Sequence, residues 1–353
     1  MQTRRMALLC RHCGTEPMAA NRNISRSACS RALATRVMKV AGFSRRGNPS
    51  AGLRPALGLR ERPRRYLQLR VLADIVDRIA WKAMQPIDDV VEHYERTREA
   101  DRLFSGPGQL ERVRTQEIIT RHLLPPPAQI LDVGGGPGVY ARWLLHEGYE
   151  VDLVDPVGSH VEAATRTFRE ERLPGRALRG DARRLDAEIA SYDAVLLLGP
   201  LYHLPERCDR IQALLEVGRV LRPGGIAFLA AISRFASLLD GFARGFVRDP
   251  EFLRILTRDL SDGQHRNAAN TDYFTTSFFH KPEEFEAEIR EAGFELQLLA
   301  GVEGPFWCIN SFPELWDDAS MRGLLLDFAR QAESEPSLLG ASAHWLAVVR
   351  TPA

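Results

Sequence analysis

One short stretch, residues 130–144, limits the folds open to this chain more than any other. It reads Ile-Leu-Asp-Val-Gly-Gly-Gly-Pro-Gly-Val-Tyr-Ala-Arg-Trp-Leu. An apolar run of strand type leads into four glycines and then into an amphipathic pattern of helical type. Glycine permits the positive φ angles and the close backbone approach that such a turn needs where free helix N–H groups face a ligand. The stretch therefore predicts a nucleotide-binding turn.

Two classes of nucleotide ligand fit this turn. Its second half satisfies the relaxed dinucleotide pattern G-x-G-x-x-G/A, and Asp155 follows about 20 residues later, as in NAD(P)-dependent oxidoreductases. Asp132 completes a longer pattern, D-x-G-x-G-x-G, whose glycines are Gly134, Gly136 and Gly138. A carboxylate there would repel a pyrophosphate, but not a ligand with an ammonium and a sulfonium. In this pattern the chain resembles the class I S-adenosylmethionine (SAM) dependent methyltransferases.

The resemblance extends over the following hundred residues. In this family the carboxyl end of each successive strand delivers one ligand contact. Asp155 matches the acid that binds the ribose hydroxyls, and Asp181 matches an acid near the adenine amino group. The apolar run 192–198 ends at Leu198, which the resemblance also places at the cofactor, and Leu-Arg-Pro-Gly-Gly at 221–225 resembles the turn before the fifth strand. The resemblance therefore implies SAM as the cofactor.

The implied fold is one α/β domain over residues 85–353. Its doubly wound sheet would have seven mostly parallel strands and a final antiparallel strand. A helical pattern over residues 88–123 precedes the first strand. The resemblance suggests that an aromatic and an arginine from this region reach the methionine end of SAM, with Tyr94 and Arg114 as candidates. The alternative for Arg114 is an ordinary solvated helix charge.

Two insertions exceed a minimal methyltransferase. We call residues 233–281 the first insertion and residues 304–341 the second insertion; the first is rich in aromatic side chains. In this fold both can lie over the carboxyl edge of the sheet, where ligands bind. Such an aromatic lid indicates a small, partly apolar methyl acceptor, although most individual Phe side chains are expected to be core residues.

Methyl transfer is an in-line displacement that depends mostly on positioning, so a base is needed only if the acceptor must lose a proton. The candidates for that role are His203 and Tyr202, just after the fourth strand, and then Tyr273, His265 and His280 in the first insertion. Each has the alternative of being an ordinary polar residue with satisfied hydrogen bonds. Because no catalytic residue is obligatory, two other functions stay open: an NAD(P)-dependent oxidoreductase and a SAM-binding protein without catalysis.

The sequence also limits which methyl acceptors and metal ions are expected. Leu-Gly-Pro-Leu at 198–201 lacks the polar clamp of enzymes that methylate an exocyclic base amine, and no cysteine stands where a base C5 methyltransferase needs its nucleophile. We therefore expect a small-molecule acceptor and no specific nucleic acid; the branch that the chain most resembles includes the quinone biosynthesis methyltransferases. No metal site is expected, since Asp317 and Asp318 are weak candidates and Cys10 and Cys13 form a single pair.

The amino-terminal part differs in charge from the remainder. The net charge of the 353 residues is +1, yet residues 1–70 hold 16 Lys or Arg against two acids. Residues 1–84 have no sustained helical or strand period, and we expect a disordered tail. Three explanations of this basic segment stay open. It could be an upstream translation of a shorter protein that begins near Met84, an organelle transit peptide, or a basic arm that binds nucleic acid. With no run of 18 apolar residues, no membrane span is expected. A cytoplasmic location is predicted, or an organelle if the tail is a transit peptide; oligomeric state stays open.

Overall fold

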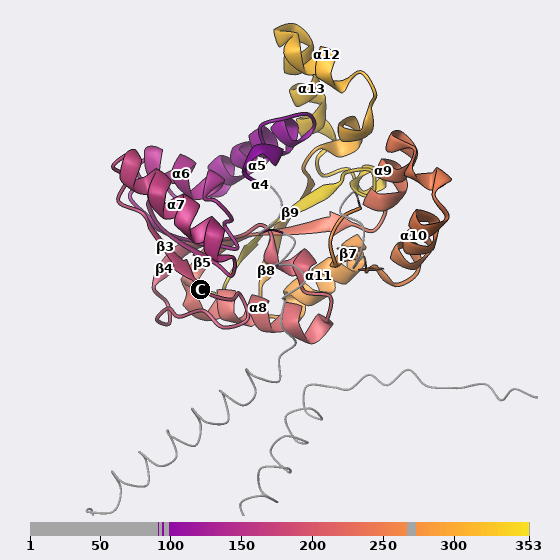
Figure 1. The fold of residues 1–353 in the computed structure, drawn as a ribbon. Coiled ribbons are helices and arrows are strands. Elements are labelled where there is room, and N and C mark those ends of the chain that lie inside the picture. Colours follow the sequence, from indigo (N-terminus) through magenta and orange to yellow (C-terminus); the bar gives the residue numbers. More distant parts are fainter. Residues whose placement is uncertain (1–90, 92–93, 95–98, 267–272, 353) are drawn as a thin grey trace, which may run out of the picture. The chain divides into compact units, whose positions relative to one another are not determined.

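A computed structural model describes Val91, Tyr94, residues 99–266 and residues 273–352 (Figure 1). The basic segment 1–84, for which we predicted disorder, lies outside these described residues. Within the described part, helices cover both faces of a central sheet. The predicted α/β class is therefore confirmed.

Seven main strands run in the order β3-β2-β1-β4-β5-β9-β8. Their bounds are β1 (Gln129–Val133), β2 (Glu150–Asp155), β3 (Arg176–Arg179), β4 (Tyr192–Leu197), β5 (Leu221–Ser233), β8 (Glu295–Gly301) and β9 (His344–Arg350). All neighbours in this order are parallel except β9, which is antiparallel to both β5 and β8. The predicted sheet with its antiparallel final strand is confirmed.

Two short strands extend this sheet beyond the prediction. They are β6 (Gln264–His265) and β7 (Ser277–His280), and β7 pairs in parallel with the last two residues of β5. The Leu-Arg-Pro-Gly-Gly segment is also not a turn before β5 but its irregular first part. Leu221 pairs with Tyr192, and the register then shifts before Ala194 pairs with Ile226.

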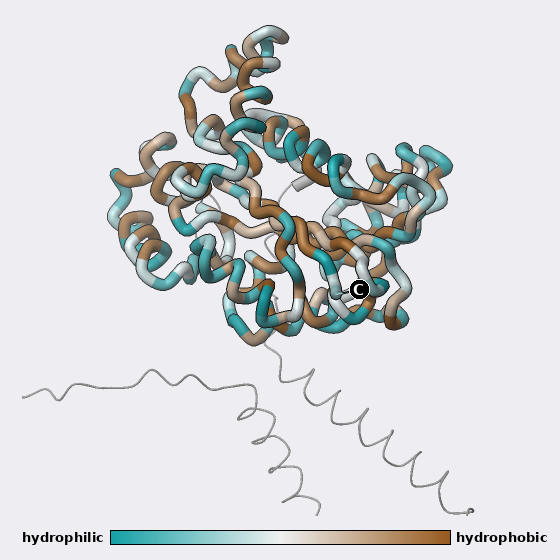
Figure 2. Tube along the Cα trace, turned by 180° about the vertical axis from the view of Figure 1, so that it is seen from behind, coloured by the Kyte–Doolittle hydropathy of each residue, from teal (hydrophilic) through white to brown (hydrophobic). Residues whose placement is uncertain are grey.

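The helices form two layers because alternate strand residues point to opposite faces of the sheet. On one face, Ile130 shares an apolar cluster with residues of α5 (Gly108–His122), α6 (Val139–His146) and α7 (Gly158–Glu170). On the other, its neighbour Leu131 shares a cluster with residues of α8 (Arg207–Val220) and α11 (Pro282–Glu291). Figure 2 shows the hydrophobic strands running through the middle of the molecule.

The insertions contribute most of the remaining helices. The first contains α9 (Ala236–Arg244), η2 (Phe246–Arg248) and α10 (Pro250–Asp262), and the second contains η3 (Gly304–Cys308), α12 (Phe312–Asp317), α13 (Ala319–Ala332) and α14 (Pro336–Leu339). Asp249 starts α10 by accepting a hydrogen bond from the Glu251 N–H at 2.8 Å, with Pro250 in the first turn. Within the described residues, no helix has the length and apolarity needed to cross a bilayer.

Candidate functional site

Two adjoining cavities lie at the carboxyl ends of the strands. The first, about 150 Å³, is lined by the glycine turn after β1, the ends of β2 and β4, and η1 (Pro200–His203). The second, about 230 Å³, is lined by the end of β5, the start of α9 and aromatic side chains of both insertions. Four residues line both cavities: Tyr94, Arg102, Tyr202 and His344. The two cavities are therefore candidates for a cofactor site and an acceptor site with a shared wall.

The glycine turn shapes the first cavity. Gly134 and Gly136 line it, and their contact with the cofactor stays a prediction. At Gly134, φ is +69°, and an added Cβ would lie 2.6 Å from the ring of Pro200, so no other residue fits without a shift. Gly138 is not part of the lining; it precedes α6, where an added Cβ would lie 3.2 Å from Ala164 of α7. Gly138 thus serves helix packing.

Asp155 ties the end of β2 to the glycine turn. Its carboxylate accepts hydrogen bonds from the N–H groups of Gly136 and Val157, at 2.8 and 2.9 Å, and lies 3.3 Å from Nδ1 of His160. The Gly136 N–H, which a pyrophosphate would need, is therefore already engaged. His160 also lines the first cavity, although it was not selected from the sequence.

Asp132 lies beneath the same turn and is 1% exposed. Among the described residues, nothing hydrogen-bonds to its Oδ2 atom. Burial, with a smaller contribution from the negative charge of Asp155, raises the pKa of Asp132 to about 7. A buried carboxylate oxygen of this kind favours a cationic group in the cavity, and the ammonium of SAM fits that requirement.

The charges around the first cavity point the same way. Four carboxylates belong to its lining: Glu111, Asp132, Asp155 and Asp181. Among the described residues of this lining, Arg102 is the only Arg or Lys, and it already forms a bidentate hydrogen bond with Glu111. An acidic cavity attracts a cationic ligand and repels a polyphosphate, so it suits SAM better than a dinucleotide.

The remaining strand ends lie as the resemblance implied. Asp181 follows β3 and lines the cavity, while Arg183 donates hydrogen bonds to its two oxygens at 3.0 and 2.7 Å. Leu198 follows β4 directly and also lines the cavity. Their contacts with the adenosine part of SAM stay predictions.

Arg114 does not reach either cavity. Its side chain is fully buried and forms ion pairs with Glu117 and Glu333. It is therefore neither the predicted cofactor contact nor the solvated charge offered as the alternative. The arginine at the site is instead Arg102, the last residue of α4 (Glu99–Arg102). It lies just before the Ser-Gly-Pro-Gly segment at residues 105–108, which interrupts the helical pattern. The pattern alone therefore could not show which arginine faces the cavity.

Three of the predicted polar residues do come together. Tyr94, which has helical backbone, lies with its Oη 2.8 Å from Nε2 of His203. The short helix η1 brings Tyr202 beside His203, with ring centroids 4.7 Å apart. All three line the first cavity.

Tyr273 was a wrong choice as a site residue. It is buried in a cluster of the first insertion with Phe252 and Leu256, its hydroxyl donates to Asp249, and it lines neither cavity. The next residue, Phe274, lines the second cavity and stacks on His203 at 5.8 Å. Two adjacent aromatic residues thus face opposite ways, which their composition could not reveal.

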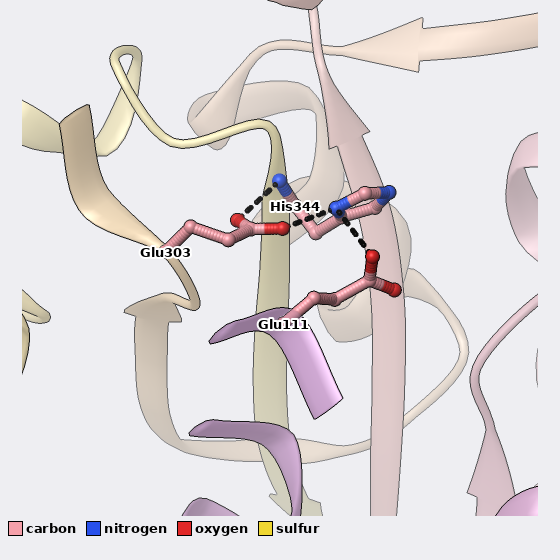
Figure 3. A group of neighbouring side chains, drawn as sticks. All are labelled: Glu111, Glu303 and His344. Atoms are coloured by element: carbon pink, nitrogen blue, oxygen red, sulfur yellow. Dashed lines mark hydrogen bonds and ion pairs between the residues drawn. The ribbon is translucent and has the colours of Figure 1, made fainter. Parts of the chain in front are cut away.

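Glu111, Glu303 and His344 form a polar group at the shared wall (Figure 3). His344 Nδ1 lies 2.5 Å from Oε1 of Glu303 and 3.7 Å from Oε2 of Glu111. Burial alone would lower the pKa of His344, but the two carboxylates raise it above its usual value. Sequence reasoning missed this group, although a histidine that starts an antiparallel strand is expected at the ligand edge of the sheet.

The three ligand atoms of this group lie within 4.8 Å of one another, as a metal site would require. In the structure these atoms are engaged in hydrogen bonds instead, because Arg102 donates to Glu111 and Nδ1 of His344 is hydrogen-bonded to Glu303. Asp318, a weak metal candidate in the sequence, caps α13 by accepting from the N–H groups of Ser320 and Met321.

Comparison with known proteins gives the same assignment. Residues 130–225 match the family model described as a methyltransferase domain. The chain is 31% identical over 118 residues to the ribosomal RNA small subunit methyltransferase C of Alcanivorax borkumensis, which covers 31% of this chain and 34% of that protein. It is 28% identical over 187 residues to the ubiquinone biosynthesis O-methyltransferase of Xanthomonas axonopodis pv. citri, which covers 53% of this chain and 70% of that protein.

A solved structure, a SAM-dependent methyltransferase of Methanosarcina mazei, is 16% identical with a TM-score of 0.47 and covers 67% of this chain and 97% of that one. The chain spans only about a third of the first relative's length. The family match covers the glycine turn and the strand ends that line the first cavity. Residues 130–225 therefore form a methyltransferase domain, and the order of the strands around it is that of the class I SAM-dependent methyltransferase fold.

Proposed function

We propose that this protein transfers a methyl group from SAM to a small, partly apolar acceptor. The observation that carries the proposal is the pair of cavities with a common wall. The first is acidic and contains the glycine turn, and the second is lined by Phe274, Phe279, Trp307 and Ile232. A methyl donor in the first cavity would have its sulfonium near the shared residues, next to an apolar space of limited size.

When bound, SAM supplies the transferable methyl group. The chain's own part is to position and to exclude water. Asp132 and Asp155 offer carboxylates to the cationic and hydroxyl-bearing parts of the ligand, and the glycine turn allows the close backbone approach. The aromatic side chains of the second cavity exclude water from the acceptor and hold it against the shared wall.

The acceptor class follows from the second cavity. Its aromatic walls favour a flat, apolar body, while Asp240, Ser237 and the four shared residues add polar groups to the lining. The ubiquinone biosynthesis O-methyltransferases among the relatives have names that point to an acceptor of this kind. A small aromatic molecule with at least one polar substituent suits this space.

Calorimetry and a labelled-methyl assay test the proposal. SAM and its demethylated product should bind the full chain, whereas NADH should not. Incubation of the protein with methyl-labelled SAM and a metabolite extract should then label a small molecule. Binding of NADH with comparable affinity would overturn the methyltransferase assignment. SAM binding without any labelled product would instead leave a SAM-binding protein without methyl transfer.

A pair of variants on one helix tests the second cavity. Ala236 lines it at the start of α9, so Ala236→Phe should fill part of the space and raise the KM for the acceptor, with SAM affinity unchanged. Ala243→Phe, at an exposed position of the same helix, is the matched control and should change neither. Equal effects of both substitutions would argue against this cavity as the acceptor site.

A further inference from the structure

His344 owes its position to the direction of its strand. Because β9 runs antiparallel to β5, the first residue of β9 pairs with Ile232, near the carboxyl end of β5. That end of the sheet is where ligands bind in folds of this type. The imidazole lines both cavities, so it stands where the donor and the acceptor must meet.

One nitrogen of the ring is held by carboxylates, and the other points away from them (Figure 3). Nδ1 lies 2.5 Å from Glu303, and Glu303 is itself fixed because its Oε2 accepts from the His344 N–H at 3.0 Å and from the Ser342 hydroxyl at 2.8 Å. A carboxylate on Nδ1–H selects the tautomer whose Nε2 carries the lone pair. The ring is thus oriented as a proton acceptor.

We infer that His344 is the general base of the methyl transfer, with Glu303 as its positioning residue, and that the acceptor presents an acidic hydroxyl, as in a phenol. This inference rests on the proposed function. In the step, Nε2 of His344 takes the hydroxyl proton while the oxygen electron pair forms the bond to the methyl carbon. The carbon–sulfur bond breaks and leaves its electron pair on sulfur. A neutral amine would not need this base before the displacement, so the arrangement favours oxygen as the methylated atom.

The charges that face His344 strengthen it as a base. Glu303, after β8, and Glu111, from α5, stabilise its protonated form, and Arg102 of α4 opposes this effect. Tyr94, and Tyr202 of η1, line both cavities with His344, and Asp240 of α9 lines the second. Among the described residues, the other ionisable groups of the first cavity are Asp132, Tyr140, Asp155, His160, Asp181 and His203. Burial works against the carboxylates, yet the pKa of His344 is raised overall. The rate should therefore rise with pH through a pKa above that of an ordinary histidine, because only the neutral ring accepts a proton.

The decisive variant is His344→Gln. It should lower turnover by roughly 10² to 10⁴, the range for a positioned base, and leave SAM affinity within about twofold by calorimetry. His146→Gln is the matched control, since His146 also pairs with a glutamate, Glu171 at 2.9 Å, but on the exposed side of α6. This control should keep full turnover. Unchanged turnover in His344→Gln would overturn the assignment.

Glu303→Gln separates positioning from simple structural support. Without the Glu303 carboxylate the pKa of His344 falls, so the rising limb of the pH–rate profile should move to lower pH. The plateau rate should drop because the ring is no longer held in position. In the ligand-free wild-type protein, NMR titration of the assigned His344 signals should show a raised pKa and a proton on Nδ1 in the neutral form. An ordinary pKa, or a proton on Nε2, would contradict the inference even if both variants failed to fold.

Two further outcomes are distinguishable. Loss of activity with a chelator and recovery with Mg²⁺ or Zn²⁺ would make the group around His344 a metal site and overturn its role as a base. A wild-type protein that binds SAM but labels no acceptor would remove the proposed function itself. In contrast, a fully active His344→Gln protein would overturn only the assignment of the base.

Discussion

The half of the domain from β1 to β5 and the two insertions use their residues in opposite ways. In the first half, the cavity is built by residues at strand ends, such as Asp155 and Leu198, whose positions follow from the order of the strands. In the first insertion, neighbours in sequence have different roles, since Tyr273 packs inside the insertion and Phe274 lines the second cavity. Regular strand topology fixes which side chain meets a ligand, whereas aromatic content alone does not.

The largest expected effect separates the two regions by stability. Phe252 is 3% exposed and packs between Phe246 and Tyr273, with ring centroids 5.5 and 5.0 Å away. Phe252→Ala should lower the free energy of unfolding by about 3 to 5 kcal/mol through the lost contacts and the cavity left behind. Leu253→Ala, at an exposed neighbouring position, should cost far less.

Chemical denaturation measures this difference, and calorimetry at a temperature where both variants are folded gives their SAM affinity. We expect that affinity to stay unchanged in both. If Phe252→Ala lost SAM binding as well as stability, the two regions would act as one unit, and the comparison between them would fail.

A second prediction tests the glycine turn. Gly134→Ala introduces a Cβ against Pro200 at a positive φ, so SAM affinity should fall by roughly ten- to a hundredfold. Gly323→Ala, inside α13, meets no atom within 4 Å and should leave SAM binding intact while slightly raising stability. Calorimetric titration of both variants with SAM measures the difference. Equal affinities would show that the turn tolerates a side chain and does not approach the ligand.

A third prediction concerns two aspartates of β2. Asp155→Ala should weaken SAM binding by roughly 1 to 3 kcal/mol, the range for losing hydrogen bonds to a charged group. Asp152→Ala is its control, because that carboxylate binds Arg176 and Tyr192 and does not line the first cavity. The rise in melting temperature on addition of SAM, measured for both variants, gives the loss of binding in each. A similar loss in the control would mean that β2 acts through folding alone.

The smallest expected effect is a pH dependence of binding. With a pKa of about 7, Asp132 is mostly protonated at pH 6, and a bound ammonium favours its ionised form. Binding should therefore release a proton. Below pH 7, SAM affinity should increase by up to about tenfold for each unit by which the pH is raised. Calorimetry in two buffers of different ionisation enthalpy detects that proton. Asp132→Asn should abolish the pH dependence, and its persistence would assign the proton to another group.

Much of the fold and part of the site could be predicted from the sequence. The glycine turn, Asp132 and Asp155 were accessible because a turn geometry and a charge requirement select them. Arg102 and Phe274 were not, since the side of a short helix or loop that faces the cavity is decided by tertiary packing. The aromatic content of the insertions was visible in the sequence, but it did not show which of their rings are core.

His344 belongs to a third category, accessible but missed. Its strand is the antiparallel final strand that the sequence predicted, and it begins at residue 344. An antiparallel final strand brings its first residue to the edge where the parallel strands end. The topology therefore held the information, and only the direction of the strand had to be used.

The antiparallel insertion of β9 between β5 and β8 also sets the order in which a nascent chain can complete the site. During translation, the glycine turn and the strand ends that follow it leave the ribosome well before residue 344. A chain exposed only as far as β8 would contain every residue predicted to hold SAM, yet it would lack the strand that separates β5 from β8 and carries the histidine. The methyl donor's site can thus precede the proton acceptor by more than a hundred residues of synthesis.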